Sequence, residues 1–125
     1  MFRGLILSLL LLPAVVAGQE PAAEAQPSIE LPPAVARVLR DYEKAWSSKD
    51  AGGLARLFAE DGYVLPNGGV PVKGRAAIER HYAGSGGPLF LRAFAYATDE
   101  NADYILGGYY GKEGGPGTGK FTVAV

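Results

Sequence analysis

The sequence predicts an α+β protein, with helices in the first half of its folded domain and an antiparallel sheet in the second half. Apolar residues recur at helical spacing between residues 33 and 58, and again between residues 74 and 82. Apolar and polar residues then alternate in three segments between residues 90 and 125, as in strands with one buried face. Because helical and strand segments are segregated along the chain, we expect the helices to pack on one face of a curved sheet.

Composition limits the protein to one ordinary globular domain. The chain has 125 residues, of which 48% are hydrophobic and 20% are charged, so neither wholesale disorder nor a fibrous repeat fits. A net charge of −1 gives no basic surface for nucleic acid. The absence of cysteine excludes disulfides, thiolate metal sites and cysteine nucleophiles, and a single histidine excludes a multi-histidine site. We therefore expect no cofactor and no metal.

The first 17 residues have the pattern of a secretory signal peptide. Arg3 precedes an uncharged, mostly apolar run from Leu5 to Ala17, which is shorter than the about 20 residues that span a bilayer. Val15 and Ala17 suit the −3 and −1 positions of a signal peptidase site, so cleavage is predicted after Ala17. The alternative is an uncleaved anchor. A cleaved protein would be secreted or periplasmic and would keep no stable membrane anchor.

Residues 18–32 are rich in Pro, Ala, Gln and Glu and lack apolar periodicity, which predicts a flexible linker. The folded domain is then residues 33–125. A domain of this size buries little apolar surface for its length, so dimerisation would help to stabilise it.

Three helices are predicted. The first begins at Pro33 and presents an apolar face that extends to Trp46. Asp50 is suited to cap a second, shorter helix, which we expect to end around residues 61–62. The third occupies residues 74–82 and is followed by a glycine-rich segment.

Five strands are predicted. Residues 63–66 and 70–72 flank the turn Asn67-Gly68-Gly69 and read as a short hairpin. The other three strands are residues 90–97, 104–110 and 120–125. The strand pattern continues up to Val125, which leaves open whether the last element is cut short.

The segment from Gly114 to Lys120 matches the letters of a phosphate-binding loop, G-x-x-x-x-G-K. That chemistry needs a Ser or Thr after the lysine and a helix whose amino terminus faces the phosphates. Residue 121 is Phe, and a strand pattern follows it. We therefore predict a glycine-rich hairpin loop and no nucleotide binding.

A longer ordered pattern lies earlier in the domain. It consists of Tyr42, Trp46, Asp50, Leu54, Leu57-Phe58-Ala59-Glu60-Asp61, Gly74-Arg75, Ala77-Ile78 and Tyr82. This pattern resembles the nuclear transport factor 2-like superfamily, which includes ketosteroid isomerase and the SnoaL-like polyketide cyclases. The resemblance implies a cone-shaped, bent antiparallel sheet wrapped around a long N-terminal helix with two shorter helices. It also implies an apolar pocket in the mouth of the cone, homodimerisation through the sheet, and a further strand beyond the position of Val125.

The resemblance carries over unevenly to individual residues. Tyr42 falls where the steroid isomerases place an oxyanion-hole tyrosine, and Tyr82 falls where they place a tyrosine hydrogen-bonded to it. The position of their general base is occupied here by Leu65 or Pro66, and no acid lies near residues 122–124. Proton abstraction beside a carbonyl needs a base, so steroid-isomerase activity is not supported.

Several side chains have two interpretations. Tyr42 and Tyr82 are either core tyrosines that bond each other or a pair that faces a ligand. His81 is the first candidate for acid–base chemistry, together with Tyr42, but its place near a helix end also suits a surface or capping role. Trp46 is more typical of a core residue than of a platform for a ligand. Asp61 is more typical of a residue that ends a helix than of a general base.

The expected ligand pocket is aromatic and apolar. Its candidate residues are Tyr42, Trp46, Tyr63, Leu65, Tyr82, Phe94, Tyr96 and Tyr109. The sequence thus predicts an exported domain that binds a small apolar molecule and forms a homodimer. The alternatives are a SnoaL-like isomerase, cyclase or hydrolase, and a non-catalytic dimerisation scaffold.

Overall fold

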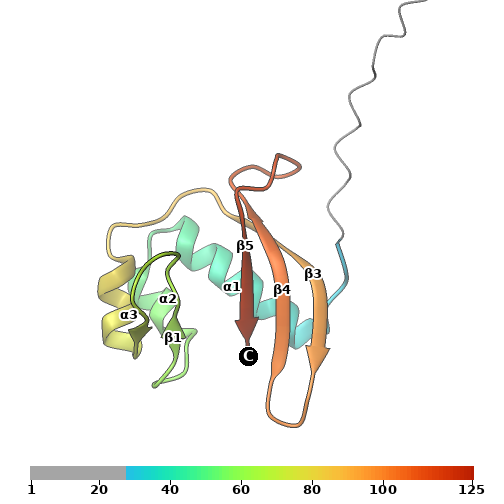
Figure 1. Ribbon diagram of the computed structural model, residues 1–125. Helices are drawn as coiled ribbons and strands as arrows, with labels where there is room; N and C mark the ends of the chain where they lie inside the picture. The colour runs from blue at the N-terminus through green and yellow to red at the C-terminus, as the bar shows by residue number, and fades with distance from the viewer. Residues whose placement is uncertain (1–27) are drawn as a thin grey trace, which may run out of the picture.

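The structure is a computed structural model and describes residues 28–125, which form three helices and five strands (Figure 1). The predicted signal peptide and residues 18–27 of the predicted linker lie outside the described residues. The helices are α1 (Pro33–Ser47), α2 (Ala51–Arg56) and α3 (Arg75–Tyr82). The strands are β1 (Tyr63–Val64), β2 (Val72–Lys73), β3 (Phe90–Thr98), β4 (Asp103–Tyr110) and β5 (Gly119–Ala124).

The strands form two antiparallel sheets. β1 and β2 make a small hairpin, and β3, β4 and β5 make a meander in that order. α1 passes behind the three-stranded sheet, while α2, α3 and the hairpin gather beside it (Figure 1). The α+β class is therefore confirmed, and the two sheets do not join into one closed surface.

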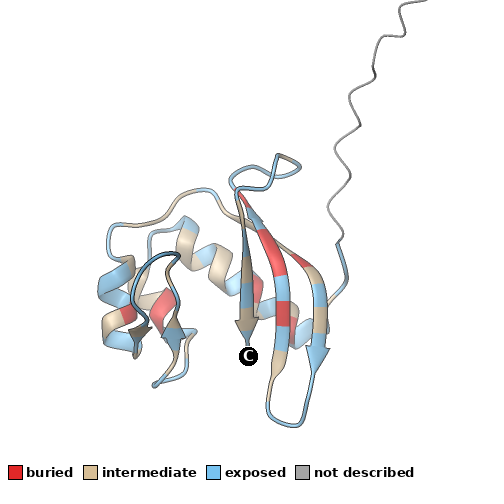
Figure 2. Ribbon diagram, viewed as in Figure 1, coloured by how far each residue is buried: buried red, intermediate tan, exposed pale blue. Residues whose placement is uncertain are grey.

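α1 begins at Pro33, as predicted, because a proline at the first helical position loses no helical hydrogen bond. Val35 and Leu39 lie one turn apart and are both buried. They form a core cluster with Ala93 of β3 and Ile105 of β4 (Figure 2). This cluster fixes α1 against the inner face of the three-stranded sheet.

The predicted end of the second helix is wrong. Asp50 caps α2 as expected, since its carboxylate accepts the Gly53 N–H at 2.7 Å. The helix nevertheless ends at Arg56, and Asp61 lies in a turn. The last turn tightens instead: the Leu57 and Phe58 N–H groups donate to carbonyls three positions back rather than four, and the helical pattern is not continued.

β3 contains an irregularity that reverses the direction of its side chains. Its pairing with β4 shifts between Ala93 and Ala95, so Phe94 is an extra residue in the ladder. Tyr96 consequently joins Ile105 on the face that packs on α1. Phe94 lies on the opposite face, over Gly108, where a Cβ would come within 2.6 Å of its ring.

A second group of buried residues lies on the short helices. Leu54 and Ala55 of α2 and Ile78 of α3 are almost fully inaccessible, and the two helices pack on each other. Among the helices of residues 28–125, none has both the length and the apolar character needed to cross a membrane.

Candidate functional site

Two tyrosines that are 40 positions apart in sequence meet between α1 and α3. Tyr42 comes from the middle of α1 and Tyr82 is the last residue of α3. The Tyr42 hydroxyl donates to the Tyr82 hydroxyl over 3.2 Å, and both side chains are half-buried. In such a tyrosine pair, one hydroxyl is always left with a hydrogen that can be donated to a third oxygen.

Two further aromatic rings surround Tyr82. The Trp46 ring, one turn beyond Tyr42 on α1, meets it edge-to-face with ring centroids 5.7 Å apart. The His81 ring lies 5.0 Å from it, centroid to centroid, and His81 is exposed. We call Tyr42, Trp46, His81 and Tyr82 the aromatic cluster.

Burial raises the pKa of Tyr42 well above its usual range, and the hydrogen bond with Tyr82 raises it further. Tyr42 therefore stays protonated throughout the physiological pH range. It can donate a hydrogen bond to an oxygen, but it cannot serve as a general base.

The remaining predicted pocket residues do not converge on the aromatic cluster. Tyr96 packs against the α1 core and donates its hydroxyl to Asp103 at 2.7 Å. Tyr109 is 37% exposed, and its ring lies over Gly119. Phe94 directly follows the core residue Ala93 and lies on the opposite face of the sheet, over Gly108.

The two candidates near the hairpin are largely open to solvent. Tyr63 is 53% exposed and Leu65 is 75% exposed. Leu65 or the adjacent Pro66 occupies the position where the resemblance would place a carboxylate. Of the predicted pocket residues, the aromatic cluster thus contains Tyr42, Trp46 and Tyr82.

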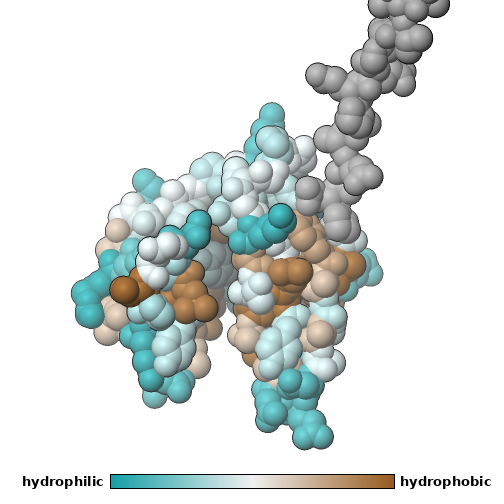
Figure 3. Space-filling view, in the orientation of Figure 1, coloured by the Kyte–Doolittle hydropathy of each residue, from teal (hydrophilic) through white to brown (hydrophobic). Residues whose placement is uncertain are grey.

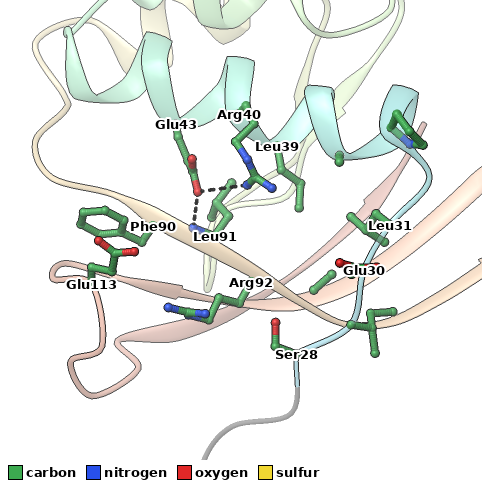
Figure 4. A pocket seen from close by; sticks show the side chains of 14 residues that line it. Ser28, Glu30, Leu31, Leu39, Arg40, Glu43, Phe90, Leu91, Arg92 and Glu113 are labelled. Atoms are coloured by element: carbon green, nitrogen blue, oxygen red, sulfur yellow. Dashed lines mark hydrogen bonds and ion pairs between the residues drawn. The ribbon is translucent and has the colours of Figure 1, made fainter.

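Sequence reasoning missed a groove of about 820 Å³ beside the start of β3 (Figure 4). Glu43 of α1 lines the groove and accepts the Leu91 backbone N–H at 2.7 Å. Arg40 lies 3.8 Å from the same carboxylate, and Arg92 and Glu113 lie on the strand side. The only sign of this groove in the sequence was the spacing of Arg40 and Glu43, three positions apart. Such oppositely charged pairs are common on helix surfaces and do not indicate what the helix packs against.

The glycine-rich segment that begins at Gly114 lies in the connection between β4 and β5, and its last residues, Gly119 and Lys120, are the first two of β5. A phosphate-binding loop would lead into a helix. Within residues 28–125, no three His, Cys, Asp or Glu side chains gather closely enough to hold a metal ion.

The fold and this site together define an α+β protein with a half-buried tyrosine pair between two helices. The chain matches no model of a known protein family, and no curated protein sequence matches it. The assignment of function therefore depends on the geometry described above.

Proposed function

We propose that this chain is an exported domain that binds a small, largely apolar molecule carrying an oxygen acceptor. The observation that carries the proposal is the Tyr42–Tyr82 hydrogen bond beside Trp46. An apolar ligand would pack on the aromatic rings, and its oxygen would accept the hydroxyl hydrogen that the tyrosine pair leaves available.

Binding without catalysis is the better supported form of this proposal. An enzyme of the proposed kind needs a titratable group that can take a proton near neutral pH. His81 is exposed and its ring packs against Tyr82 alone among the aromatic residues that the structure describes, whereas Tyr42 is held neutral by burial. Tyr42 therefore cannot act as a base, and no hydrogen bond or ring contact joins His81 to Tyr42.

The nuclear transport factor 2-like superfamily remains the proposed relationship, with its cone-shaped sheet, long first helix and homodimer. The order of elements is compatible with it, because two short helices and a hairpin separate α1 from three meandering strands. Tyr104 and Leu106 are 41% and 46% exposed on the face of β4 turned away from Ile105, so this face could be covered by a second copy. Secretion or periplasmic export is proposed from the sequence of residues 1–17 alone.

The test is native mass spectrometry of the mature protein after export from a bacterial host. We expect a co-purified small molecule on the wild-type protein and a mass that begins at Gly18. Y42F and Y82F should lose the adduct, because each removes one hydroxyl of the pair. Y63F is the matched control, since it removes an exposed tyrosine hydroxyl outside the cluster.

Trp46 gives an independent readout because it is the only tryptophan in the chain and touches Tyr82. The extracted molecule, added back to stripped protein, should change its fluorescence in wild type and Y63F and fail to do so in Y42F. A wild-type protein without any adduct, or equal binding by Y42F and Y63F, would contradict the proposal.

A further inference from the structure

The groove between α1 and the start of β3 contains two backbone groups that no residue of 28–125 satisfies. On β3, the Leu91 N–H donates to Glu43 at 2.7 Å, and the Ala93 carbonyl accepts the Ile29 N–H at 3.0 Å, so both point away from β4. Because the N–H and C=O of one strand residue point to the same side, the Leu91 carbonyl and the Ala93 N–H also face the groove, which both residues line. Neither group bonds another residue in the described part of the chain.

This open part of the β3 edge fits a single residue. In a parallel ladder, one residue donates its N–H to a carbonyl of the neighbouring strand and accepts the N–H that lies two residues further along that strand. The Leu91 carbonyl and the Ala93 N–H form such a pair. A longer strand would also need the Leu91 N–H and the Ala93 carbonyl, which Glu43 and Ile29 already occupy.

Charged side chains complement the two ends of a free amino acid. Glu43 lies beside Leu91, and Glu113, which forms no ion pair within residues 28–125, also lines the groove. Arg40 lies one turn earlier on α1 and points toward β3, as Glu43 does (Figure 4). Carboxylates stabilise an ammonium group, and a guanidinium stabilises a carboxylate.

The rest of the groove supplies an apolar surface. Leu31, Ala36 and Leu39 line it, and Leu39 belongs to the core cluster under the sheet. The groove differs in this combination from the hollow between the three-stranded sheet and the β1–β2 hairpin, where hydrophobic surface lies on both sides (Figure 3). A small-molecule site needs both an apolar lining and a few polar groups that fix the orientation of the ligand.

We propose that this groove is a second binding site, which takes a free α-amino acid with an apolar side chain. The ammonium group would donate to the Leu91 carbonyl beside Glu43. The carboxylate would accept the Ala93 N–H on the side of Arg40, and the side chain would pack on Ala36. The groove shares no lining residue with the aromatic cluster, so this site does not rest on the function proposed above.

The test is isothermal titration calorimetry of the mature full chain with L-leucine, for which we expect saturable binding. Leucinamide lacks the carboxylate and N-acetyl-leucine lacks the ammonium group, so each should bind at least about ten-fold more weakly. Glycine keeps both charges but has no side chain to pack, and should also bind at least about ten-fold more weakly.

Two variants locate the binding. A36L extends a side chain into the groove and should weaken L-leucine binding at least about ten-fold. A34L is the matched control, because Ala34 is exposed on the same helix and does not line the groove. Y42F should bind L-leucine as wild type does, which separates this site from the aromatic cluster.

The ligand series keeps the test decisive if A36L fails to fold. Absence of saturable L-leucine binding would overturn the proposal, as would equal binding of L-leucine, leucinamide and N-acetyl-leucine. Equal loss in folded A36L and A34L would place the binding outside the groove and would overturn it as well.

Discussion

At the residue scale, Glu43 joins a helix to a sheet edge through one carboxylate. Its side chain is only 21% exposed and accepts the Leu91 N–H at 2.7 Å. We expect E43A to lower the free energy of unfolding by about 2 kcal/mol, because a hydrogen bond to a charged group is lost and a strand N–H is left without its acceptor. Urea denaturation measures this change.

The matched control is E43Q, whose amide oxygen can still accept the Leu91 N–H. It should cost less than about 1 kcal/mol, because only the charge is removed. Equal losses in E43A and E43Q would show that the hydrogen bond contributes little and that Glu43 acts through its charge toward Arg40.

The candidate site shows what single residues reveal in a sequence. Tyr42 and Trp46 could be identified because they share a face of a periodic helix, and the resemblance paired Tyr42 with Tyr82. The hydrogen bond itself depends on how α1 and α3 are placed, which no local pattern encodes. Phe94 and Tyr96, which strict alternation places on one face, lie on opposite faces because one inserted residue in a strand reverses which face each following side chain occupies.

At the element scale, α2 depends on its cap because it is only six residues long and contains two glycines. The Asp50 carboxylate satisfies the Gly53 N–H at 2.7 Å. D50A should therefore lower the free energy of unfolding by about 1 kcal/mol. D50S retains a capping oxygen and should lower it by only about 0.3 kcal/mol. Thermal unfolding of both variants checks this, and equal destabilisation would argue against a capping role.

The elements were predictable where local chemistry determines them. Pro33 marked the start of α1, Asp50 marked the cap of α2, and alternation located β3 to β5. The end of α2 was not predictable because Leu57 and Phe58 suit a helix, and no local pattern shows that their N–H groups bond carbonyls three positions back. A usable signal for the β3 irregularity was present in Gly107-Gly108, since adjacent glycines inside a strand often mark close approach of another group.

At the scale of the whole molecule, seven of the eight buried hydrophobic residues fall into two groups that α1 links, and Tyr110 lies outside both. Ile105 packs with Val35, Leu39 and Ala93, whereas Ile78 is buried where α3 meets α2. Both isoleucines are 0% exposed, so I105A and I78A should each cost about 2–5 kcal/mol. They are matched substitutions in the two groups, and each should act mainly on its own group.

Native-state hydrogen exchange distinguishes the groups. I105A should speed exchange in β3, β4 and β5 while α2 and α3 keep most of their protection, and I78A should do the reverse. If each variant speeds hydrogen exchange equally in the sheet and in the short helices, the two groups unfold as one cooperative unit. Because the Tyr42–Tyr82 bond spans α1 and α3, I78A should also loosen Tyr82 and weaken the response of Trp46 to ligand more than I105A does. The proposed binding site would then depend more on the packing of α3 against α2 than on the core beneath the three-stranded sheet.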